Sequence, residues 1–254
     1  MKPLEVLITS GGTITKIDDI RHIGNFSGGS TGARIAEAFL ESGASVHYIH
    51  SKHAKRPFRS QLALDPNKNL EDEIMRLHTA TNRYLVHANR LHEYVIQTFA
   101  QYHDTLERVL KSEPIDVVVL AAAVSDYGAR HQKGKISSSQ DKMTIELEKL
   151  PKVIGKVKEW KLDVYQVGFK LLADVDDYEL IGRAYEHGLK SGSDLTVANS
   201  VRDGNFNKRH VYFVMPQRFA ISVPLVELGP RLVRAVYDNI RSTTNEKSYE
   251  KSTQ

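Results

Sequence analysis

The sequence predicts an α/β protein of three layers, in which helices cover both faces of a doubly wound, mostly parallel β-sheet. Residues 4–9, 117–121 and 164–169 are mainly apolar and rich in branched side chains, as strands buried on both faces are. A segment with helical spacing of apolar residues, 33–42, follows the first run and ends before Gly43. A strand, a helix and a second strand in this order form a right-handed parallel unit.

The other elements are expected from shorter patterns. No internal repeat or linker divides the chain, so residues 1–254 are predicted to form one domain, with a polar, frayed tail over about 242–254. The expected elements are strands over 44–50 and 83–87, a long amphipathic helix over 91–111, a helix over 177–190, a strand over 194–198, a hairpin of 211–216 and 219–225, and a closing helix over 230–241.

The composition excludes several classes of protein. With 254 residues, 41% hydrophobic and 26% charged, the chain can bury a core and is not disordered. The 35 basic and 31 acidic side chains are interspersed, which argues against a dedicated nucleic-acid binder. The absence of Cys excludes disulfides, thiolate zinc sites and a Cys nucleophile. No apolar run approaches the roughly 20 residues that span a bilayer, and the first residues do not form a secretory signal, so we expect a cytoplasmic protein without a membrane partner.

Two glycine-rich segments are candidates for a phosphate site. Gly11, Gly12 and Thr13 follow the first predicted strand, where glycine lets the backbone approach a ligand; a tight turn explains them equally well, since neither GxGxxG nor a P-loop is present. Residues 25–32, NFSGGSTG, precede the predicted helix at 33 and offer helix N-terminal amides to an anion, although Ser30 or Thr31 could simply cap the helix. Together the two segments favour a nucleotide or phosphate site.

An acid and a lysine lie further along the chain. In residues 121–127, AAAVSDY, small side chains provide a flat floor, and Asp126 is placed to hold a metal ion or a hydroxyl group unless it only forms a turn. Lys135 lies in a polar loop. It is a solvated charge unless a phosphate needs to be neutralised there.

These segments together resemble one family. The motifs LITSGGT, IDDIRHIGNFSGGSTGARIA, AAAVSDY, GKISSS, LPKVIGKVKEW, VGFK and DLTVANS occur in order over residues 7–199 and resemble phosphopantothenoylcysteine synthetase, or phosphopantothenate–cysteine ligase, of coenzyme A biosynthesis. The resemblance implies a Rossmann-like fold. Because the chain begins at the synthetase itself, it also implies the stand-alone form, without the flavin-dependent decarboxylase.

The resemblance implies a ligation in two steps. The carboxylate of 4'-phosphopantothenate attacks the α-phosphate of a nucleoside triphosphate, with CTP favoured over ATP, and pyrophosphate leaves with the help of Mg²⁺. The amine of cysteine then displaces the nucleotide and forms the amide. A chain without Cys suits this reaction because the only thiol arrives with the substrate.

The resemblance also implies roles for individual residues. Asn25 and Lys135 are implied to be catalytic, and phosphopantothenate is implied to contact Arg21, Asn25 and Ala123. Asp126 is a possible Mg²⁺ ligand, with the ion held mainly by the phosphates. The residues implied to contact the nucleotide are Gly11, Gly12, Thr13, Asp126, Lys135, Phe169, Lys190 and Asn199.

Some features depart from the family pattern. IGN replaces ITN or ISN, Ser200 replaces the acid after Asn199, and residues 64–92 match poorly and carry an extra helix-like stretch, NLEDEIMRLHTA. Family members are homodimers, and the resemblance implies a small β dimerisation arm over about residues 135–151 that reaches the partner's site.

Two other functions remain open. A nucleotide-binding regulatory module without turnover would not need Asn25, Asp126 and Lys135 together. A Rossmann-type oxidoreductase would need GxGxxG after the first strand and an acid after the second, where Ser51 and Lys52 stand.

Two polar groups are expected to be structural. His47, His50 and His53 do not share one helical face, so a zinc site is not predicted. A run of basic residues is expected to be a solvated loop, with a secondary effect of attracting anions; its members are Lys52, Lys55, Arg56 and Arg59.

Overall fold

A twisted β-sheet forms the centre of the molecule. The computed structural model describes residues 2–59, 62, 64–139, 141–202, 205–206 and 210–252. Along the sheet the strands lie in the order β13-β12-β10-β9-β6-β1-β4-β5, with β11 beside β10. The parallel strands are β1 (Glu5–Ser10), β4 (Ser45–Ser51), β5 (Leu91–Ile96), β6 (Val117–Leu120), β9 (Tyr165–Ala173) and β10 (Leu195–Arg202). The antiparallel strands are β11 (Asn205–Phe206), β12 (His210–Val214) and β13 (Ala220–Pro224).

The strand order confirms the predicted fold class. In chain order the parallel strands start at β1 in the middle, run outward to β5, return to β6 on the other side of β1, and run outward again to β10. This is the order of doubly wound dinucleotide-binding folds. The direction of winding changes between β1 and β6, so a crevice is expected where the carboxyl ends of these two strands meet.

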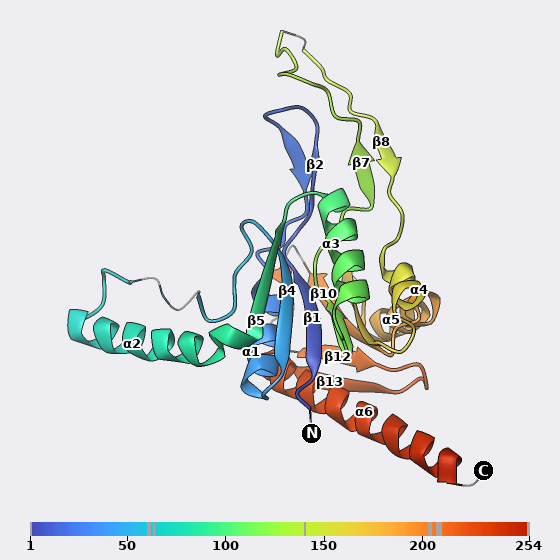
Figure 1. Cartoon of the computed structure of the whole chain (residues 1–254). Helices are drawn as coiled ribbons and strands as arrows, with labels where there is room; N and C mark the ends of the chain where they lie inside the picture. Colours follow the sequence, from blue (N-terminus) through green and yellow to red (C-terminus); the bar gives the residue numbers. More distant parts are fainter. Residues whose placement is uncertain are drawn as a thin grey trace.

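Helices cover both faces of the sheet (Figure 1). On one face α1 (Ser30–Glu41) and α6 (Leu228–Ser252) bury apolar side chains against alternate residues of β1, β4, β6 and β9. On the other face lie α3 (Phe99–Ser112), α4 (Val157–Trp160) and α5 (Asp177–Ser191). Because successive strand residues point to opposite faces, the continuous apolar runs of β1 and β6 serve both layers.

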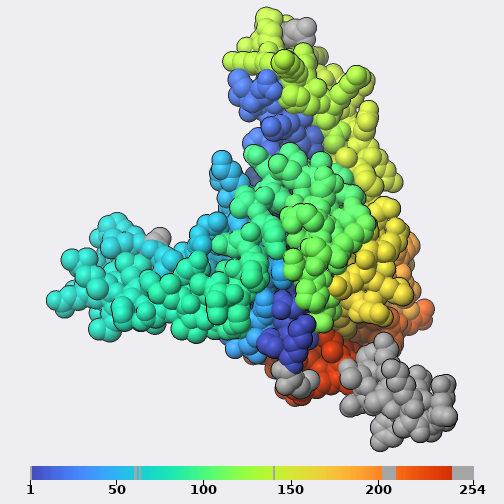
Figure 2. Space-filling model, in the orientation of Figure 1, coloured from blue at the N-terminus to red at the C-terminus, as the bar shows by residue number. Residues whose placement is uncertain are grey.

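Two extensions stand clear of this body (Figures 1 and 2). One is α2 (Leu70–His87), followed by η2 (Ala88–Arg90). The other, which we call the arm, combines the hairpin of β2 (Ile14–Lys16) and β3 (His22–Gly24) with the pair β7 (Tyr127–Ala129) and β8 (Leu147–Lys149). The predicted strand-rich arm over 135–151 therefore begins earlier, at Tyr127. Single turns η3 (Ile154–Lys156) and η4 (Leu225–Glu227) lead into α4 and α6.

Several predicted elements are confirmed and two are wrong. The strands over 4–9, 44–50, 117–121, 164–169 and 194–198, the helix over 177–190 and the C-terminal hairpin are present within a few residues. The extra helix-like stretch is part of α2, which Asn69 caps by accepting hydrogen bonds from the N–H groups of Glu71 and Asp72. The predicted strand over 83–87 is wrong, because these residues continue the same helix.

The other error concerns residues 91–111. The predicted helix over 91–111 is a strand, β5, followed by α3, because β5 pairs with β4 and the side chain of Thr98 caps α3 in a capping box with Gln101. The backbone of α6 is helical to Ser252, through most of the tail over 242–254 that is predicted to fray. Among the helices that the structure describes, none has the length and hydropathy needed to cross a membrane.

Candidate functional site

The loops after β1 and β6 are joined at the carboxyl edge of the sheet. Gly12 and Ala123 form a parallel bridge. The N–H of Ala123 donates to the carbonyl of Gly11 at 2.8 Å, and the N–H of Thr13 donates to the carbonyl of Ala123 at 3.1 Å. The first glycine motif and the AAAVSDY motif therefore form one continuous surface at the point where the sheet changes its direction of winding.

Glycine is required at this surface. Gly11 has φ +82°, and a Cβ there would lie 2.1 Å from Oγ of Ser51, at the end of β4. A Cβ on Gly12 would lie 2.6 Å from the carbonyl oxygen of Asn25. At both positions an atom of another segment, the Ser51 side chain or the Asn25 backbone, lies closer than a Cβ allows.

The N-terminus of α1 opens onto the same edge. Its N-cap is Gly29, in the left-handed conformation with φ 73°, and no side chain caps the helix, so the two cap candidates named above, Ser30 and Thr31, are the first helical residues instead. Ser10 at the end of β1 donates its hydroxyl hydrogen to the carbonyl of Gly29 at 3.1 Å. Uncapped first-turn amides and the helix dipole favour an anion at this position.

Asn25 lies between these loops. Its side chain is exposed, and Nδ2 donates to the carbonyl of Ala123 at 3.1 Å. Nearby, the buried Thr13 hydroxyl oxygen accepts from the N–H of Ser125 at 2.9 Å and lies 3.1 Å from the Ser125 hydroxyl. These contacts bring the predicted residues Gly11, Gly12, Thr13, Asn25 and Ala123 into one cluster, which we call the crevice.

Asp126 is the acidic residue closest in sequence to the crevice loop. Its carboxylate is 59% exposed and receives a hydrogen bond from Nζ of Lys152 at 2.5 Å. Mg²⁺ is usually bound by one or two carboxylates together with phosphates, and an accessible carboxylate here fits that pattern. Among the residues that the structure describes, no three His, Asp or Glu side chains group as a complete metal site.

Phe169 lies in the middle of β9, and Asn199 lies in the carboxyl-terminal half of the neighbouring strand β10. Phe169 pairs with Val197, and Leu171 pairs with Asn199. Paired residues share a face of the sheet, and Phe169 packs against the core beneath α1. These two predicted nucleotide contacts therefore lie on the α1 side of the carboxyl edge.

Arg21 binds the residue that follows Lys135 on the arm. Buried Asp18 accepts hydrogen bonds from the N–H groups of Ile20, Arg21 and Ile136, at 2.8, 2.6 and 3.1 Å, and from Nε of Arg21 at 2.9 Å. Arg21 also donates to the carbonyl of Ile136 at 2.6 Å. The backbone at Lys135, the preceding residue, is thus held near Arg21.

Asp18 holds this junction in its ionised state. Burial by itself would raise the pKa of Asp18, but the backbone N–H donors of Arg21, Ile20 and Ile136 and the Arg21 guanidinium together hold it well below its ordinary value. The charge that organises the arm is therefore present throughout the neutral range.

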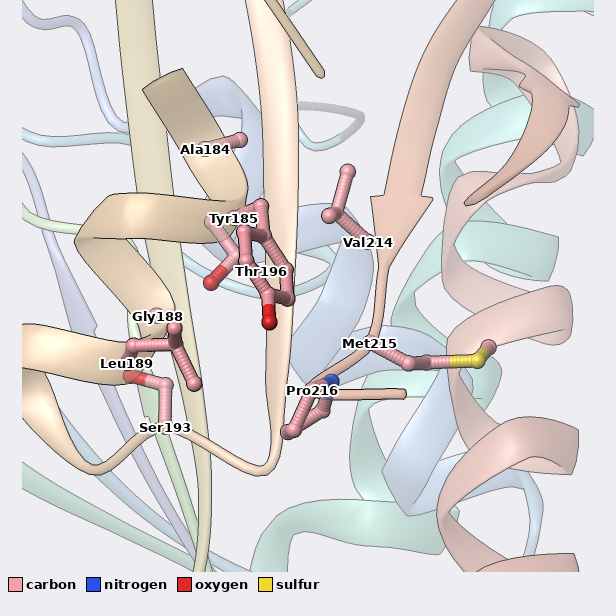
Figure 3. A pocket seen from close by; sticks show the side chains of 9 residues that line it. All are labelled: Ala184, Tyr185, Gly188, Leu189, Ser193, Thr196, Val214, Met215 and Pro216. Atoms are coloured by element: carbon pink, nitrogen blue, oxygen red, sulfur yellow. The ribbon is translucent and has the colours of Figure 1, made fainter. Parts of the chain in front are cut away.

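Lys190 does not join the crevice. It lies in the last turn of α5, before β10 begins, whereas Asn199 lies four residues into that strand. At a rise of about 3.3 Å per residue, Asn199 lies about 13 Å along the strand from the first residue of β10. Next to Lys190 is the hollow of Figure 3, between α5 and β10, where a Cβ on Gly188 would lie 2.8 Å from the Thr196 hydroxyl oxygen. The hollow is too tightly packed for a nucleotide.

The prediction that the basic run at 52–59 is a solvated loop is partly wrong. Arg56 and Arg59 form ion pairs with Glu93 of β5 at 3.1 and 3.0 Å. The N–H of Lys55 donates to the carbonyl of Gly28 at 2.9 Å, so this segment supports the glycine loop before α1. Two of the three histidines that are expected to be structural lie beside different carboxylates: His47 beside Glu5 and His50 beside Glu93.

Sequence reasoning missed three functional candidates. Asp18 stands in the IDDIR part of a recognised motif, Ser125 in AAAVSDY, and Lys152 in LPK, yet no role was assigned to any of them. Their motifs were visible. Only the fold shows that Asp18 lies beneath Arg21, that Ser125 binds Thr13, and that Lys152 faces Asp126.

The fold and the crevice define a Rossmann-like α/β protein with its ligand edge at the switch point between β1 and β6. A family model described as the DNA/pantothenate metabolism flavoprotein C-terminal domain matches residues 1–88 and 77–227. The chain belongs to this family.

Known proteins agree with this assignment. The chain is 34% identical over 231 residues to the coenzyme A biosynthesis bifunctional protein CoaBC of Thermococcus kodakarensis, covering 89% of this chain and 49% of that protein. It is 26% identical to the human phosphopantothenate–cysteine ligase, covering 93% and 85%. The solved structure of a Cab2 mutant in complex with phosphopantothenate-cysteine has the same fold, with a TM-score of 0.78, 22% identity, and 95% and 89% coverage. The chain spans about half the length of the bifunctional relatives it matches.

Substituting Gly11 tests the close approach of the loops. We expect Gly11→Ala to lower the free energy of unfolding by about 2 kcal/mol or more, because alanine must adopt a positive φ and displace Ser51. Gly28→Ala is the matched control, since a Cβ there meets nothing within 4 Å, and it should change stability by less than about 1 kcal/mol. Urea denaturation measures both; equal effects would contradict the account.

The low pKa of Asp18 gives a pH prediction. Its carboxylate stays charged as the pH falls to the ordinary Asp pKa of about 4, and the contribution of the junction to stability is lost only in stronger acid, as the pH passes the lowered pKa. The amide NMR shifts of Ile20, Arg21 and Ile136 should therefore stay constant from pH 7 to about 4 and move below that. Movement between pH 7 and 5 would show that Asp18 is not held in this way.

Proposed function

We propose that this protein joins 4'-phosphopantothenate to cysteine, with a nucleoside triphosphate as the activating co-substrate. The observation that carries the proposal is the convergence of separate motifs: Gly11 to Thr13, Asn25 and Ala123 contact one another directly at the switch point of the sheet. The activities named for the family relatives support the same reaction. The product would enter coenzyme A biosynthesis.

In the first step a substrate carboxylate oxygen attacks the α-phosphorus. A bond forms between them, the bond from that phosphorus to the bridging oxygen breaks, and pyrophosphate leaves. The attacking and attacked groups are both anionic, so cations must neutralise the charge that develops. Lys135 is the cation that we assign to this step, and Mg²⁺, bound by Asp126 and the phosphates, would further offset charge on the leaving group.

In the second step the amine nitrogen of cysteine attacks the acyl carbon, and the carbon–oxygen bond to the nucleotide breaks. The amine loses a proton and a nucleoside monophosphate leaves. The Nδ2 group of Asn25 is an exposed donor beside the crevice. We assign it to the carbonyl oxygen as that oxygen gains negative charge, which is the stabilisation that an oxyanion hole provides.

The remaining substrate contacts follow from the same geometry. The N-terminus of α1 is assigned to a phosphate, and Phe169 and Asn199 to the nucleoside on the α1 side of the edge. Ala123 leaves room beside Asn25 for the acyl group. CTP is favoured over ATP as the nucleotide, and the reaction is assigned to a single cytoplasmic domain that comprises residues 1–254.

The arm suggests that two chains complete each site. Arg21 and Lys135 lie on an extension that stands away from the sheet body (Figure 1). The chain has an accessible surface of 15449 Å², whereas a compact monomer of this mass has about 11,300 Å². We propose a homodimer in which the arm of one chain brings Arg21 and Lys135 to the crevice of the other.

Two variants separate the steps. Lys135→Ala should abolish pyrophosphate release with phosphopantothenate, cysteine and either CTP or ATP, because the first step loses its cation. Asn25→Ala should still release pyrophosphate and should accumulate the acyl-nucleotide, detectable by mass spectrometry. Lys133→Ala, on the same exposed loop, is the control and should behave as the wild type. Near-normal pyrophosphate release by Lys135→Ala, or rapid amide formation by Asn25→Ala, would refute the roles assigned.

A further inference from the structure

A group of basic side chains lies beside the crevice, on the face of the sheet opposite to α1. Its members are Lys152, before η3, Lys170 of β9, and His187 of α5. We call them the basic seam, because they lie where η3 and α5 pack against β9. None of them was predicted to have a role.

The strand register sets the direction of Lys170. Lys170 pairs with Ala198 of β10, and paired residues point to the same face. Ala198 packs against Leu180 and Ala184 of α5. Lys170 therefore projects towards α5, away from the face on which Phe169 lies.

The other two members are placed by the same packing. His187 follows Ala184 by three residues and precedes Gly188, and both neighbours are buried on the sheet-facing side of α5. A Cβ on Gly168 would lie 3.2 Å from Cδ1 of Ile154, so η3 rests on β9 two residues before Lys170. Lys152, two residues before Ile154, reaches the same seam from the crevice side.

The seam has more positive charge than the described residues neutralise. Within that part of the chain, no carboxylate lies within ion-pair distance of Lys170, which is half-buried, and Lys152 pairs with Asp126 alone. Nε2 of His187 is buried without a hydrogen-bond partner. Burial, and then the charges of Lys170 and Lys152, lower the pKa of His187, so both lysines lie near it.

Such an arrangement is unfavourable until an anion binds. A half-buried lysine such as Lys170 is normally paired, and an unpartnered buried nitrogen such as Nε2 of His187 costs free energy. A multiply charged anion would neutralise both lysines and could accept a hydrogen bond from His187. The ligand of this seam is therefore a polyphosphate rather than a neutral group.

We propose that Lys152 and Lys170 bind the β- and γ-phosphates of the nucleotide, and the pyrophosphate that leaves. This rests on the proposed function and replaces Lys190 in that role. The chain of phosphates would start at the crevice, cross the carboxyl edge and end in the seam. When Lys152 exchanges Asp126 for phosphate, that carboxylate becomes free to bind a divalent cation.

Binding of inorganic pyrophosphate to the full chain, measured by isothermal titration calorimetry, tests the proposal without requiring turnover. Lys170→Ala and Lys152→Ala should each weaken binding at least tenfold, and Lys170→Arg should recover part of the loss. Two controls should bind as the wild type does: Lys149→Ala on β8, and Lys190→Ala at the other edge of the sheet. Circular dichroism verifies that each variant folds; Lys152 is 65% exposed, so its variant remains informative if Lys170→Ala does not fold.

The outcomes separate the two proposals. Wild-type affinity in both Lys152→Ala and Lys170→Ala, or an equal loss in Lys190→Ala, would overturn the basic seam as the polyphosphate site, even if the enzyme makes phosphopantothenoylcysteine. Loss of pyrophosphate binding in the two seam variants would support the seam even if no ligation is found. In an active enzyme, the same variants should raise the KM for the nucleotide at least tenfold and leave the KM for cysteine unchanged.

Discussion

The close approach of backbone segments at the end of β1 is the constraint on which the rest of the site depends. Gly11 lies against Ser51, Gly12 against Asn25, and Gly29 against Ser10. Without side chains at these glycines, the loops after β1 and β6 and the N-terminus of α1 can meet within one small region. The doubly wound strand order brings those loops to the same edge, and the glycines allow them to touch.

The molecule divides the proposed chemistry between two rigid parts. The crevice is fixed by backbone hydrogen bonds between the loops that hold Gly11 and Ala123, whereas Arg21 and Lys135 are fixed on the arm by the buried Asp18 carboxylate. Each part is preorganised by its own contacts, so the substrates would not have to order either one. The basic seam lies beside the crevice, on the face of the sheet opposite to α1.

Much of this could be predicted from the sequence, because it depends on local patterns. Apolar runs identified β1, β4, β6 and β9, and the motifs identified the loops that meet at the crevice. The strand over 91–96 was missed because its residues read equally well as the first turns of α3, and only pairing with β4 decides between them. The role of Lys190 rests on the family resemblance alone, and the structure puts the first residues of β10 between the end of α5 and Asn199. The pairing of Lys152 with Asp126 joins residues 26 positions apart and has no local signal.

The most direct test of the central claim is a map of where the nucleotide binds. Amide NMR shifts of the labelled protein can be followed while it is titrated with a CTP analogue that carries a methylene group between the α- and β-phosphates. Binding at the carboxyl edge predicts that the largest changes occur at Gly11, Gly12, Ser30 and Thr31. If the largest changes instead occurred around Leu189 and Ser193, at the opposite edge, with the glycine loops unaffected, the account would be contradicted.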